Sequence, residues 1–575
     1  MKTILVTFNS KYIHSSLALA SLSSYLKKKG QSVTTLEFSL QTPVLSALSE
    51  VFAEEPDVVG IALHIWNRQQ SFSLAKLIKT VMTKVILILG GPEVSFAVED
   101  AFAEFPQIDF IVQGEGEEVL FNLLRQIEKG ECGKIVPGAA WLGEKGEIHF
   151  VGGAQIVKDI SILEFPYDFS DDRLKHKIVY YESTRGCPFS CTYCLSGVSR
   201  EVRFKPLEQV YIDMQKFIMA GVKQVKFIDR TYNLDKKHYF PMMHWLAEQD
   251  TQTNFHFEIK ADNLDEEILE FLANVPVGRF QFEIGVQSVH EKTLAVSGRK
   301  QDWDRLSDAV KKLKNYRNIH LHLDLIAGLP FESMQDFAVS FNKVYELQPD
   351  MLQLGFLKLL RGSLLQLTAK EYCYSFMPEP PYEVLANKFI SYSELRKLKL
   401  LEAVFEQTYN SGKFMYSLQY IVEEFYDNEA YVFYSKLADW WERKGLFLLG
   451  QNAQAIAEHL VAFCKEYGTV DKYFCLLDCV KLDIILFHDK NFRPNWLDWQ
   501  TTGTGTKSER FWRAESLVCK YLPNYKFNSW RDINNNYHIE VFEHYLYRRK
   551  LTEKQAVFFD KNHSQCILLQ KEDFF

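Results

Sequence analysis

The stretch that decides the fold is RGCPFSCTYC, residues 185–194, which follows a strand-like run at residues 178–184. It places Cys187, Cys191 and Cys194 at CxxxCxxC spacing on one short loop. Cysteine thiolates hold iron–sulfur clusters, and three of them can hold three irons of a [4Fe-4S] cube and leave the fourth iron open. The glycine and the proline of the stretch suit a loop that wraps closely around a cluster. We therefore expect the three cysteines to be cluster ligands.

A zinc site is the alternative for these cysteines. Structural zinc sites usually combine a CxxC pair with a second pair of Cys or His ligands. The sequence contains no second CxxC and no HxxxH pair. The pattern therefore favours the iron–sulfur cluster.

The motif, with Tyr193 directly before the last cysteine, resembles the signature of the radical S-adenosylmethionine (SAM) superfamily. The resemblance implies that the open iron binds the amine and carboxylate of SAM. It also implies that an electron from the cluster splits SAM into methionine and a 5'-deoxyadenosyl radical.

Length and composition are typical of a globular protein with several domains. The chain has 575 residues, 47% of them hydrophobic and 24% charged, with a net charge of −8. At about 100 to 200 residues per domain, three or four domains are expected. The mild acidity argues against a wholly electrostatic nucleic-acid binder. The N-terminus does not have the pattern of a signal peptide, and no apolar run is long enough to cross a membrane, so we expect a cytoplasmic protein whose ten cysteines are ligands or free thiols.

Apolar runs alternate with helical patterns in the first 150 residues. Strands are expected at residues 4–8, 33–38, 58–63, 85–89 and 110–112. Strands joined by helical crossovers predict a doubly wound parallel sheet of flavodoxin-like type, with ligands at the carboxyl ends of the strands. We expect this domain at residues 1–150, followed by a linker at 151–177.

The loops at those strand ends are rich in Gly, Asn, His and Trp, more than simple connections require. The segments Gly-Gly-Pro-Glu at 90–93 and Gln-Gly-Glu-Gly-Glu at 113–117 resemble the N-terminal cobalamin-binding domain of one branch of radical SAM proteins. Ordinary helix starts with acidic first turns are the alternative. The resemblance implies these cobalamin-binding residues: Asn9, His14, His64, Trp66, Asn67, Gly90, Gly91, Pro92, Glu93, Gly114 and Glu115.

One departure from that family affects the cobalt. Classical cobalamin domains carry DxHxxG after the first strand, with a histidine that binds cobalt from below, whereas this sequence has Asn-Ser-Lys-Tyr-Ile-His at residues 9–14. A single histidine such as His14 or His64 is more often packed or hydrogen-bonded than a metal ligand. We therefore expect bound cobalamin without an assigned axial ligand.

The middle of the chain, residues 178–375, alternates again. Strands are expected at residues 178–184, 224–228, 254–259, 279–286, 319–326 and 351–356. Six strand–helix units predict a partial (β/α)6 barrel with its functional residues at the carboxyl ends of the strands. The cysteine loop leaves the first of these strands.

Polar residues at the later strand ends resemble SAM-binding positions of the superfamily. Asp229 stands where the family often has a Gly-Gly-Glu motif, and Arg299 matches a basic residue that pairs with the SAM carboxylate. For each of these residues taken alone, the alternative is an ordinary polar side chain at a solvated strand end without a role in SAM binding. The expected SAM-binding residues are Tyr193, Asp229, Glu283, Gln287, Ser288 and Arg299.

The last part, residues 376–575, is predicted to be a mainly α-helical domain. Helices are expected at residues 382–408, 415–426, 431–444, 452–466 and 470–487. The region resembles the uncharacterised C-terminal domain, DUF4080-like, of one bacterial B12-binding radical SAM family. Arginines beside aromatics after residue 501 can contact nucleic acid or lie over a helical surface, and we favour the surface role. Cys475 and Cys479 share a helix face, but no further ligands accompany them in the sequence, so buried thiols are favoured over a metal site.

Together these motifs predict a cobalamin-dependent radical SAM enzyme. The favoured reaction is methylation of an unactivated carbon: one SAM methylates cob(I)alamin, and a second yields the radical that activates the substrate. An electron donor such as flavodoxin or ferredoxin is implied. The alternatives are a rearrangement or oxidation with a non-methylating cobalamin, a tRNA- or peptide-modifying enzyme, and a corrinoid carrier or sensor that needs only the first domain.

Overall fold

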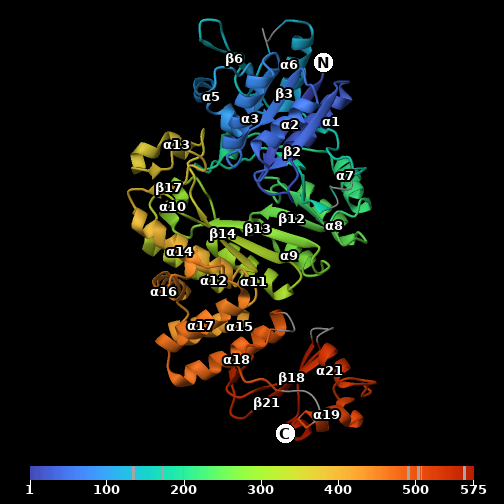
Figure 1. The fold of residues 1–575 in the computed structure, drawn as a ribbon, viewed down its shortest axis with the longest axis vertical. Coiled ribbons are helices and arrows are strands. Elements are labelled where there is room, and N and C mark those ends of the chain that lie inside the picture. The colour runs from blue at the N-terminus through green and yellow to red at the C-terminus, as the bar shows by residue number, and fades with distance from the viewer. Residues whose placement is uncertain are drawn as a thin grey trace. The chain divides into compact units, whose positions relative to one another are not determined.

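The computed structural model describes residues 1–131, 136–170, 174, 176–198, 200–488, 492–500, 505–506, 508–560 and 565–575. Parts of the expected linker at residues 151–177 lie outside these residues. The chain forms two compact units, Met1–Leu395 and Arg396–Phe575. The first unit extends past the boundary at 375 that the sequence suggested, and Figure 1 shows its two sheets in blue and in green to yellow.

The first sheet has the strand order β2-β1-β3-β4-β5-β6-β7. Its parallel part consists of β1 (Thr3–Asn9), β2 (Val33–Ser39), β3 (Val58–Ala62), β4 (Ile86–Gly90) and β5 (Phe110–Val112). The order 2-1-3-4-5 confirms the flavodoxin-like sheet. Beyond β5 the sheet continues with β6 (Ala139–Leu142) and β7 (Ile148–Phe150), which pair antiparallel. The sequence analysis did not predict this hairpin.

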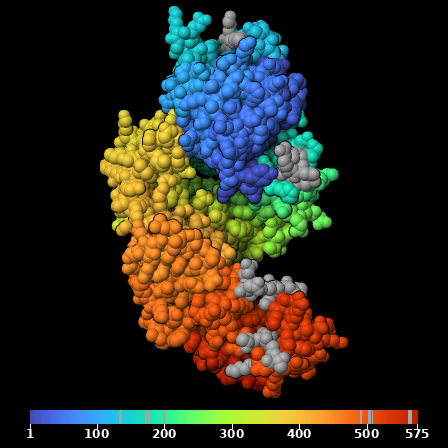
Figure 2. Space-filling model, viewed as in Figure 1, coloured from blue at the N-terminus to red at the C-terminus, as the bar shows by residue number. Residues whose placement is uncertain are grey.

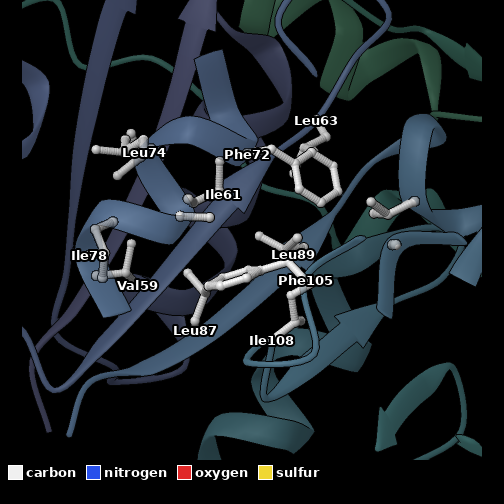
Figure 3. Packing of buried hydrophobic residues seen from close by; sticks show 14 of the residues in the cluster. Val59, Ile61, Leu63, Phe72, Leu74, Ile78, Leu87, Leu89, Phe105 and Ile108 are labelled. Atoms are coloured by element: carbon white, nitrogen blue, oxygen red, sulfur yellow. The ribbon is translucent and has the colours of Figure 1, made fainter. Parts of the chain in front are cut away.

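Helices cover both faces of the first sheet because the buried strands are apolar on both faces. The helices are α1 (Leu17–Lys28), α2 (Val44–Ala53), α3 (Arg68–Val81), α4 (Pro92–Ser95), α5 (Val98–Glu104) and α6 (Gly116–Glu128). One core joins the sheet to α2, α3 and α5, where Phe72, Leu87 and Phe105 pack together (Figure 3). The other core joins the sheet to α1 and α6.

The second sheet contains six parallel strands in the order β15-β14-β13-β12-β11-β8. Its strands are β8 (Val179–Tyr181), β11 (Gln224–Phe227), β12 (Asn254–Ile259), β13 (Phe280–Gln287), β14 (His320–Ala327) and β15 (Met351–Phe356). The short strands β9 (Thr184–Arg185) and β10 (Arg203–Phe204) flank the cysteine loop as an antiparallel pair. The predicted partial (β/α)6 barrel is confirmed.

The connecting helices of the barrel are α7 (Leu207–Met219), α8 (Lys236–Glu248), α9 (Glu266–Leu272), α10 (Glu291–Val296), α11 (Trp303–Tyr316), α12 (Met334–Glu346) and α13 (Leu364–Leu367). Polar caps fix their starts: Asp265 accepts a hydrogen bond from Ile268 N, and Ser333 forms a capping box with Asp336. A small hairpin, β16 (Ser375–Phe376) and β17 (Val384–Ala386), follows α13.

The second unit begins within α14 (Tyr392–Thr408) and continues with α15 (Met415–Tyr426), α16 (Ala430–Arg443), α17 (Ala453–Tyr467) and α18 (Val470–Phe487). The helix expected at residues 382–408 therefore starts ten residues later than predicted, because β17 and the cis Pro380–Pro381 peptide precede it. Cys475 and Cys479 are buried thiols on α18.

The C-terminal residues add a sheet that the sequence did not predict. Strands β18 (Tyr537–Phe542), β21 (Gln555–Asp560) and β22 (Gln565–Leu568) pair antiparallel, and β19 (Tyr545–Leu546) pairs with β20 (Arg549–Lys550). Short helices α19 (Glu509–Arg513), α20 (Glu515–Val518), α21 (Trp530–Asn536) and α22 (Lys571–Phe574) accompany them. Within the described residues, no helix is long and apolar enough to span a membrane.

Candidate active site

Backbone contacts hold the cysteine loop in one conformation. Gly186 has a φ of +100°, and a Cβ there would lie 2.0 Å from the carbonyl oxygen of Glu201. Gly298, on the segment that packs against the loop, is restricted in the same way, because a Cβ there would lie 2.5 Å from Ser190 O. Thr192 N donates to Ser297 O at 3.0 Å, and Thr192 O accepts from Leu365 N at 2.8 Å. The loop is therefore fixed between α10 and α13.

The three thiols of the loop lie close enough to affect one another. Burial raises the pKa of Cys187, and the thiolates of Cys194 and Cys191 raise it further. Tyr193 hydrogen-bonds with Cys191, and burial raises the pKa of its phenol. Among the described residues, no group of three or more His, Cys, Asp or Glu converges on one ion. In a cubic cluster each of the three thiolates would bind a different iron.

A cavity of about 200 Å³ opens beside the cysteine loop at the carboxyl ends of the barrel strands. Three of the expected SAM-binding residues, Glu283, Gln287 and Arg299, line it together with Cys191. Gln287 has a φ of +68° at a bulge in β13, and its Oε1 is buried without a hydrogen-bond partner in the described residues. Such an oxygen is available to a ligand donor.

The charges in this cavity are unevenly paired. Glu283 Oε2 lies 3.0 Å from Lys226 Nζ and 3.2 Å from His256 Nε2. Burial would raise the pKa of Glu283, but these two partners lower it to about 2. Burial and the neighbouring Glu283 raise the pKa of Glu258, which lines the same cavity, to about 7. Of the three carboxylates on the cavity wall, Glu283 is thus held ionised and Glu258 titrates near neutral pH, while burial raises the pKa of Asp324.

Asp229 and Ser288 lie behind this cavity rather than on its wall. Asp229 is fully buried and accepts hydrogen bonds from Ser183 N, Ser183 Oγ and Thr184 Oγ1 at 3.2, 2.8 and 2.5 Å. It thereby ties the exit of β11 to the start of the cysteine loop. Ser288 is also fully buried and donates to Glu332. Tyr193 does not line the cavity either.

A second, larger cavity of about 760 Å³ lies between the carboxyl edge of the first sheet and the barrel. Figure 2 shows a hollow where the blue residues meet the green and yellow ones. Eight of the expected cobalamin-binding residues line it: Asn9, His14, His64, Trp66, Gly91, Pro92, Gly114 and Glu115. They come from the ends of β1, β3, β4 and β5, as a flavodoxin-like sheet requires.

Three expected cobalamin-binding residues do not line this cavity. Asn67 is buried, and its amide donates to Thr7 Oγ1 and Phe8 O at 3.1 and 3.0 Å. Glu93 is buried and accepts from Tyr382 OH at 2.7 Å. Gly90 lies within β4 instead of on the loop beyond it. Asn67 and Glu93 therefore brace the loops that face the cavity.

Two of the glycines on the cavity wall, Gly91 and Gly114, are required by the packing of the chain itself. A Cβ at Gly91 would lie 2.3 Å from Leu63 O, and a Cβ at Gly114 would lie 2.2 Å from Gln155 O. Both residues have positive φ values, +101° and +82°. The fold itself therefore requires glycine at both positions.

The two histidines on the wall have different surroundings. His14 Nδ1 lies 2.6 Å from Tyr180 OH, so this nitrogen is occupied. His64 stacks on Trp66 with ring centroids 4.4 Å apart, and burial lowers its pKa to about 4. Its Nδ1 is buried without a hydrogen-bond partner in the described residues. A neutral imidazole with a free nitrogen is able to accept a hydrogen bond or bind a metal.

An ion network joins the first sheet to the cysteine loop. Arg185 Nη2 donates to Glu117 Oε1 at 2.7 Å, and Arg185 Nε donates to Glu182 at 2.8 Å. Arg203 binds Glu115 with both terminal nitrogens, at 2.7 and 2.9 Å. Burial would raise the pKa of Glu117, but the charge and hydrogen bond of Arg185 and the hydrogen bond of Ser21 lower it. Five members of this network line the large cavity: Arg185, Arg203, Glu115, Glu117 and Glu182.

Sequence reasoning missed several lining residues. Arg185 was part of the motif but received no role, and Arg203 lies on the strand after the loop. Arg230 stands next to Asp229, which took the expected SAM role. Their sequence signal was only that a charged residue lies near a strand end. The partners on the first domain that orient Arg185 and Arg203 lie 68 and 88 positions away in the chain.

Comparisons with known proteins agree with this architecture. Residues 3–124 match the model of the B12 binding domain, and residues 181–344 match that of the Radical SAM superfamily. The fold and the site thus define a radical SAM protein with an N-terminal B12-binding domain. Residues 370–559 match the model of a protein of unknown function, DUF4080, so each of the three regions that the sequence suggested matches a family model.

Similar proteins include cobalamin-dependent enzymes. An uncharacterized methyltransferase of Pyrococcus horikoshii, PH0819, is 23% identical over 59% of this chain and 74% of its own length. The cobalamin-dependent radical SAM methyltransferase TokK of Streptomyces tokunonensis is 23% identical over 51% of this chain, but the match spans only 45% of TokK. The structure of the cobalamin-dependent radical enzyme OxsB with aqua-cobalamin and SAM has a TM-score of 0.61 and 16% identity, covering 84% of this chain and 79% of OxsB.

Proposed function

We propose that this chain is a cobalamin-dependent radical SAM methyltransferase that methylates an unactivated carbon. In this proposal Cys187, Cys191 and Cys194 hold a [4Fe-4S] cluster, the small cavity holds SAM, and the large cavity holds cobalamin. The observation that carries the proposal is that one loop borders both cavities. Cys191 lines the small cavity, and Gly186 with Leu195 lines the large one.

The residues present fit both cofactors. Arg299 offers a guanidinium that suits the SAM carboxylate, and the free Gln287 Oε1 suits a ligand N–H or O–H. Trp66 offers an indole face, and His64 offers an unpaired ring nitrogen, on the wall proposed for cobalamin. When bound, SAM and the cluster supply a 5'-deoxyadenosyl radical, and cobalamin supplies a transferable methyl group. The chain contributes orientation and the exclusion of water.

The test is anaerobic reconstitution with iron, sulfide and hydroxocobalamin, followed by reduction in the presence of SAM. Mass spectrometry should detect 5'-deoxyadenosine from the wild type and none from the variant with Cys187→Ala, Cys191→Ala and Cys194→Ala. That variant should still bind cobalamin, because the corrin wall comes mainly from the first sheet. A wild type that binds cobalamin but yields no 5'-deoxyadenosine would identify a corrinoid carrier instead.

The products also separate methylation from other radical reactions. Methyl transfer produces S-adenosylhomocysteine together with 5'-deoxyadenosine, since each turnover uses one SAM as methyl donor and one as radical source. Formation of 5'-deoxyadenosine alone, with substrate present, would favour rearrangement or oxidation. A flavodoxin or ferredoxin in a reducing, cytoplasmic setting is the proposed electron source, because the cluster must be reduced before it cleaves SAM.

A further inference from the structure

Arg230 lies where the two cavities meet. Among the described residues, it alone lines both the cavity of about 200 Å³ and the cavity of about 760 Å³. It lies three residues beyond the end of β11, and the hydrogen bonds of the buried Asp229 beside it fix the backbone at this point. Its side chain is exposed. A ligand that reached from one cavity to the other would therefore pass this guanidinium.

The proposed reaction requires such a ligand. The carbon that is methylated must meet the radical generated beside Cys191 and the methyl group carried on the other side of the loop. A substrate can satisfy both conditions only at the junction of the two cavities, because near-attack geometry requires reacting atoms about 3 to 3.5 Å apart. The residue at the junction is therefore expected to contact the substrate.

The charge of Arg230 is not neutralised by an ion pair within the described residues. Other cations nearby have partners: Lys226 pairs with Glu283, and Lys260 pairs with Asp262. Burial raises the pKa of Glu258 to about 7. The charge of Arg230 lowers that pKa, but burial outweighs this effect. Glu258 is thus only partly ionised at neutral pH and leaves Arg230 with excess positive charge.

The remaining cations at this edge do not reduce the positive charge around Arg230. Arg299 donates to Gly285 O and to Gln301 Oε1, and the proposed function gives it the SAM carboxylate. Lys300 is exposed on the wall of the small cavity and adds a further positive charge. An anionic group placed beside Arg230 would thus meet an attractive field.

We propose that Arg230 binds an anionic group of the substrate, either a carboxylate or a phosphate. This inference rests on the proposed function. The planar guanidinium binds either oxyanion through two parallel hydrogen bonds. The substrate class is thus a small molecule or side chain with an oxyanion near the carbon that receives the methyl group. Arg230 then determines specificity through its contact with substrate.

The test uses holoprotein loaded with cluster, cobalamin and SAM, and two probes in place of the unidentified substrate. Inorganic phosphate is followed by ³¹P NMR line broadening and acetate by ¹H NMR line broadening, at constant ionic strength maintained with chloride. The variants are Arg230→Gln, Arg230→Lys and the exposed control Lys223→Gln. SAM affinity and substrate-free formation of 5'-deoxyadenosine are measured on the same samples.

We expect saturable broadening of at least one anion in the wild type and in Lys223→Gln. The half-saturation concentration should rise at least tenfold in Arg230→Gln and less in Arg230→Lys, which keeps the charge but loses the fork. Stronger binding of phosphate would point to a phosphorylated substrate, and stronger binding of acetate to a carboxylate. SAM affinity should change by less than threefold.

Three results would overturn the inference: no saturable broadening in the wild type, equal broadening in Arg230→Gln, or a loss of SAM affinity as large as the loss of anion binding. The last result would assign Arg230 to the SAM site. These outcomes are distinct from failure of the proposed function. A wild type that binds the anion through Arg230 but cleaves no SAM would contradict the proposed enzymatic function and still support the anion-binding site.

Discussion

Arg185, two residues before the first cluster cysteine, donates a hydrogen bond of 2.7 Å to Glu117 at the start of helix α6. The side chains are only 13% and 5% exposed. The pair joins the loop proposed to hold the cluster to the domain proposed to hold cobalamin. Any movement of one relative to the other must therefore break a buried ion pair.

We predict that Arg185→Ala lowers the free energy of unfolding by about 3 to 5 kcal/mol, because breaking one partner of a buried pair leaves the other charge uncompensated. A double-mutant cycle with Glu117→Gln should give a coupling energy of roughly 0.5 to 3 kcal/mol. The exposed pair Lys312–Glu266 is the control, with an expected coupling of about 1 kcal/mol or less. Urea denaturation of the full chain measures both cycles, and equal couplings would contradict the prediction.

The same pair predicts a dependence on acid. The pKa of Glu117 is below its ordinary value of 4.5 in the folded chain. Its ionised form is therefore favoured by folding, so the stabilisation is present above pH 4.5 and is lost as the pH falls below it. Glu117→Gln should flatten this acid limb of the stability profile. An unchanged acid limb would show that other carboxylates dominate it.

Gly186→Ala should prevent cluster binding, because the new Cβ would lie 2.0 Å from Glu201 O and displace the cysteine loop. The matched control is Gly221→Ala, at a φ of +67° with nothing within 4 Å of the new Cβ. That variant should suffer only the left-handed strain, about 1 to 2 kcal/mol. Iron and sulfide analysis after anaerobic reconstitution compares the two, and normal iron content in Gly186→Ala would be inconsistent with the observed packing.

Asp229→Ala should destabilise the chain rather than act on SAM alone. Removal of the carboxylate leaves donors on Ser183 and Thr184 without their acceptor, at about 1 to 3 kcal/mol for each unsatisfied group. Thr184→Val removes one donor and should cost less. Thermal unfolding and SAM titration distinguish a structural role of Asp229 from a role in SAM binding. A normal melting temperature with weak SAM binding would contradict the structural role and support the SAM contact expected from the sequence.

SAM affinity should increase as the pH rises through about 7. Glu258, whose pKa is raised to about 7, becomes negatively charged over this range, and SAM carries a sulfonium cation that a carboxylate in the same cavity attracts. Calorimetric titration with SAM between pH 6 and 8 measures the change, and Glu258→Gln should remove it. The same slope in that variant would exclude Glu258 as its source.

The sequence predicted the parallel strands well, because buried parallel strands are continuous apolar runs bounded by turn residues. The expected runs at 254–259 and 351–356 coincide with β12 and β15. Residues at strand ends were also predictable, since the carboxyl edge of such a sheet gathers them in one place. This rule placed His64 and Gly91 on a cavity wall.

What sequence could not supply was the direction of each polar side chain. Glu93 bonds to Tyr382, a residue 289 positions away, and Asp229 bonds to Ser183 and Thr184. No local sequence pattern distinguishes a buried side chain that hydrogen-bonds within the fold from one that binds a ligand. The C-terminal sheet was missed for a related reason: its short antiparallel strands lie between loops and short helices, where the alternating pattern is brief.

The central claim is that a cluster on the cysteine loop and a corrin in the large cavity are close neighbours. The most direct measurement is pulsed EPR of holoprotein in which both cofactors are reduced to paramagnetic states. We predict a dipolar interaction between the two spins that disappears in the variant lacking the three cysteines. Full loading of both cofactors with no measurable interaction between them would contradict the account.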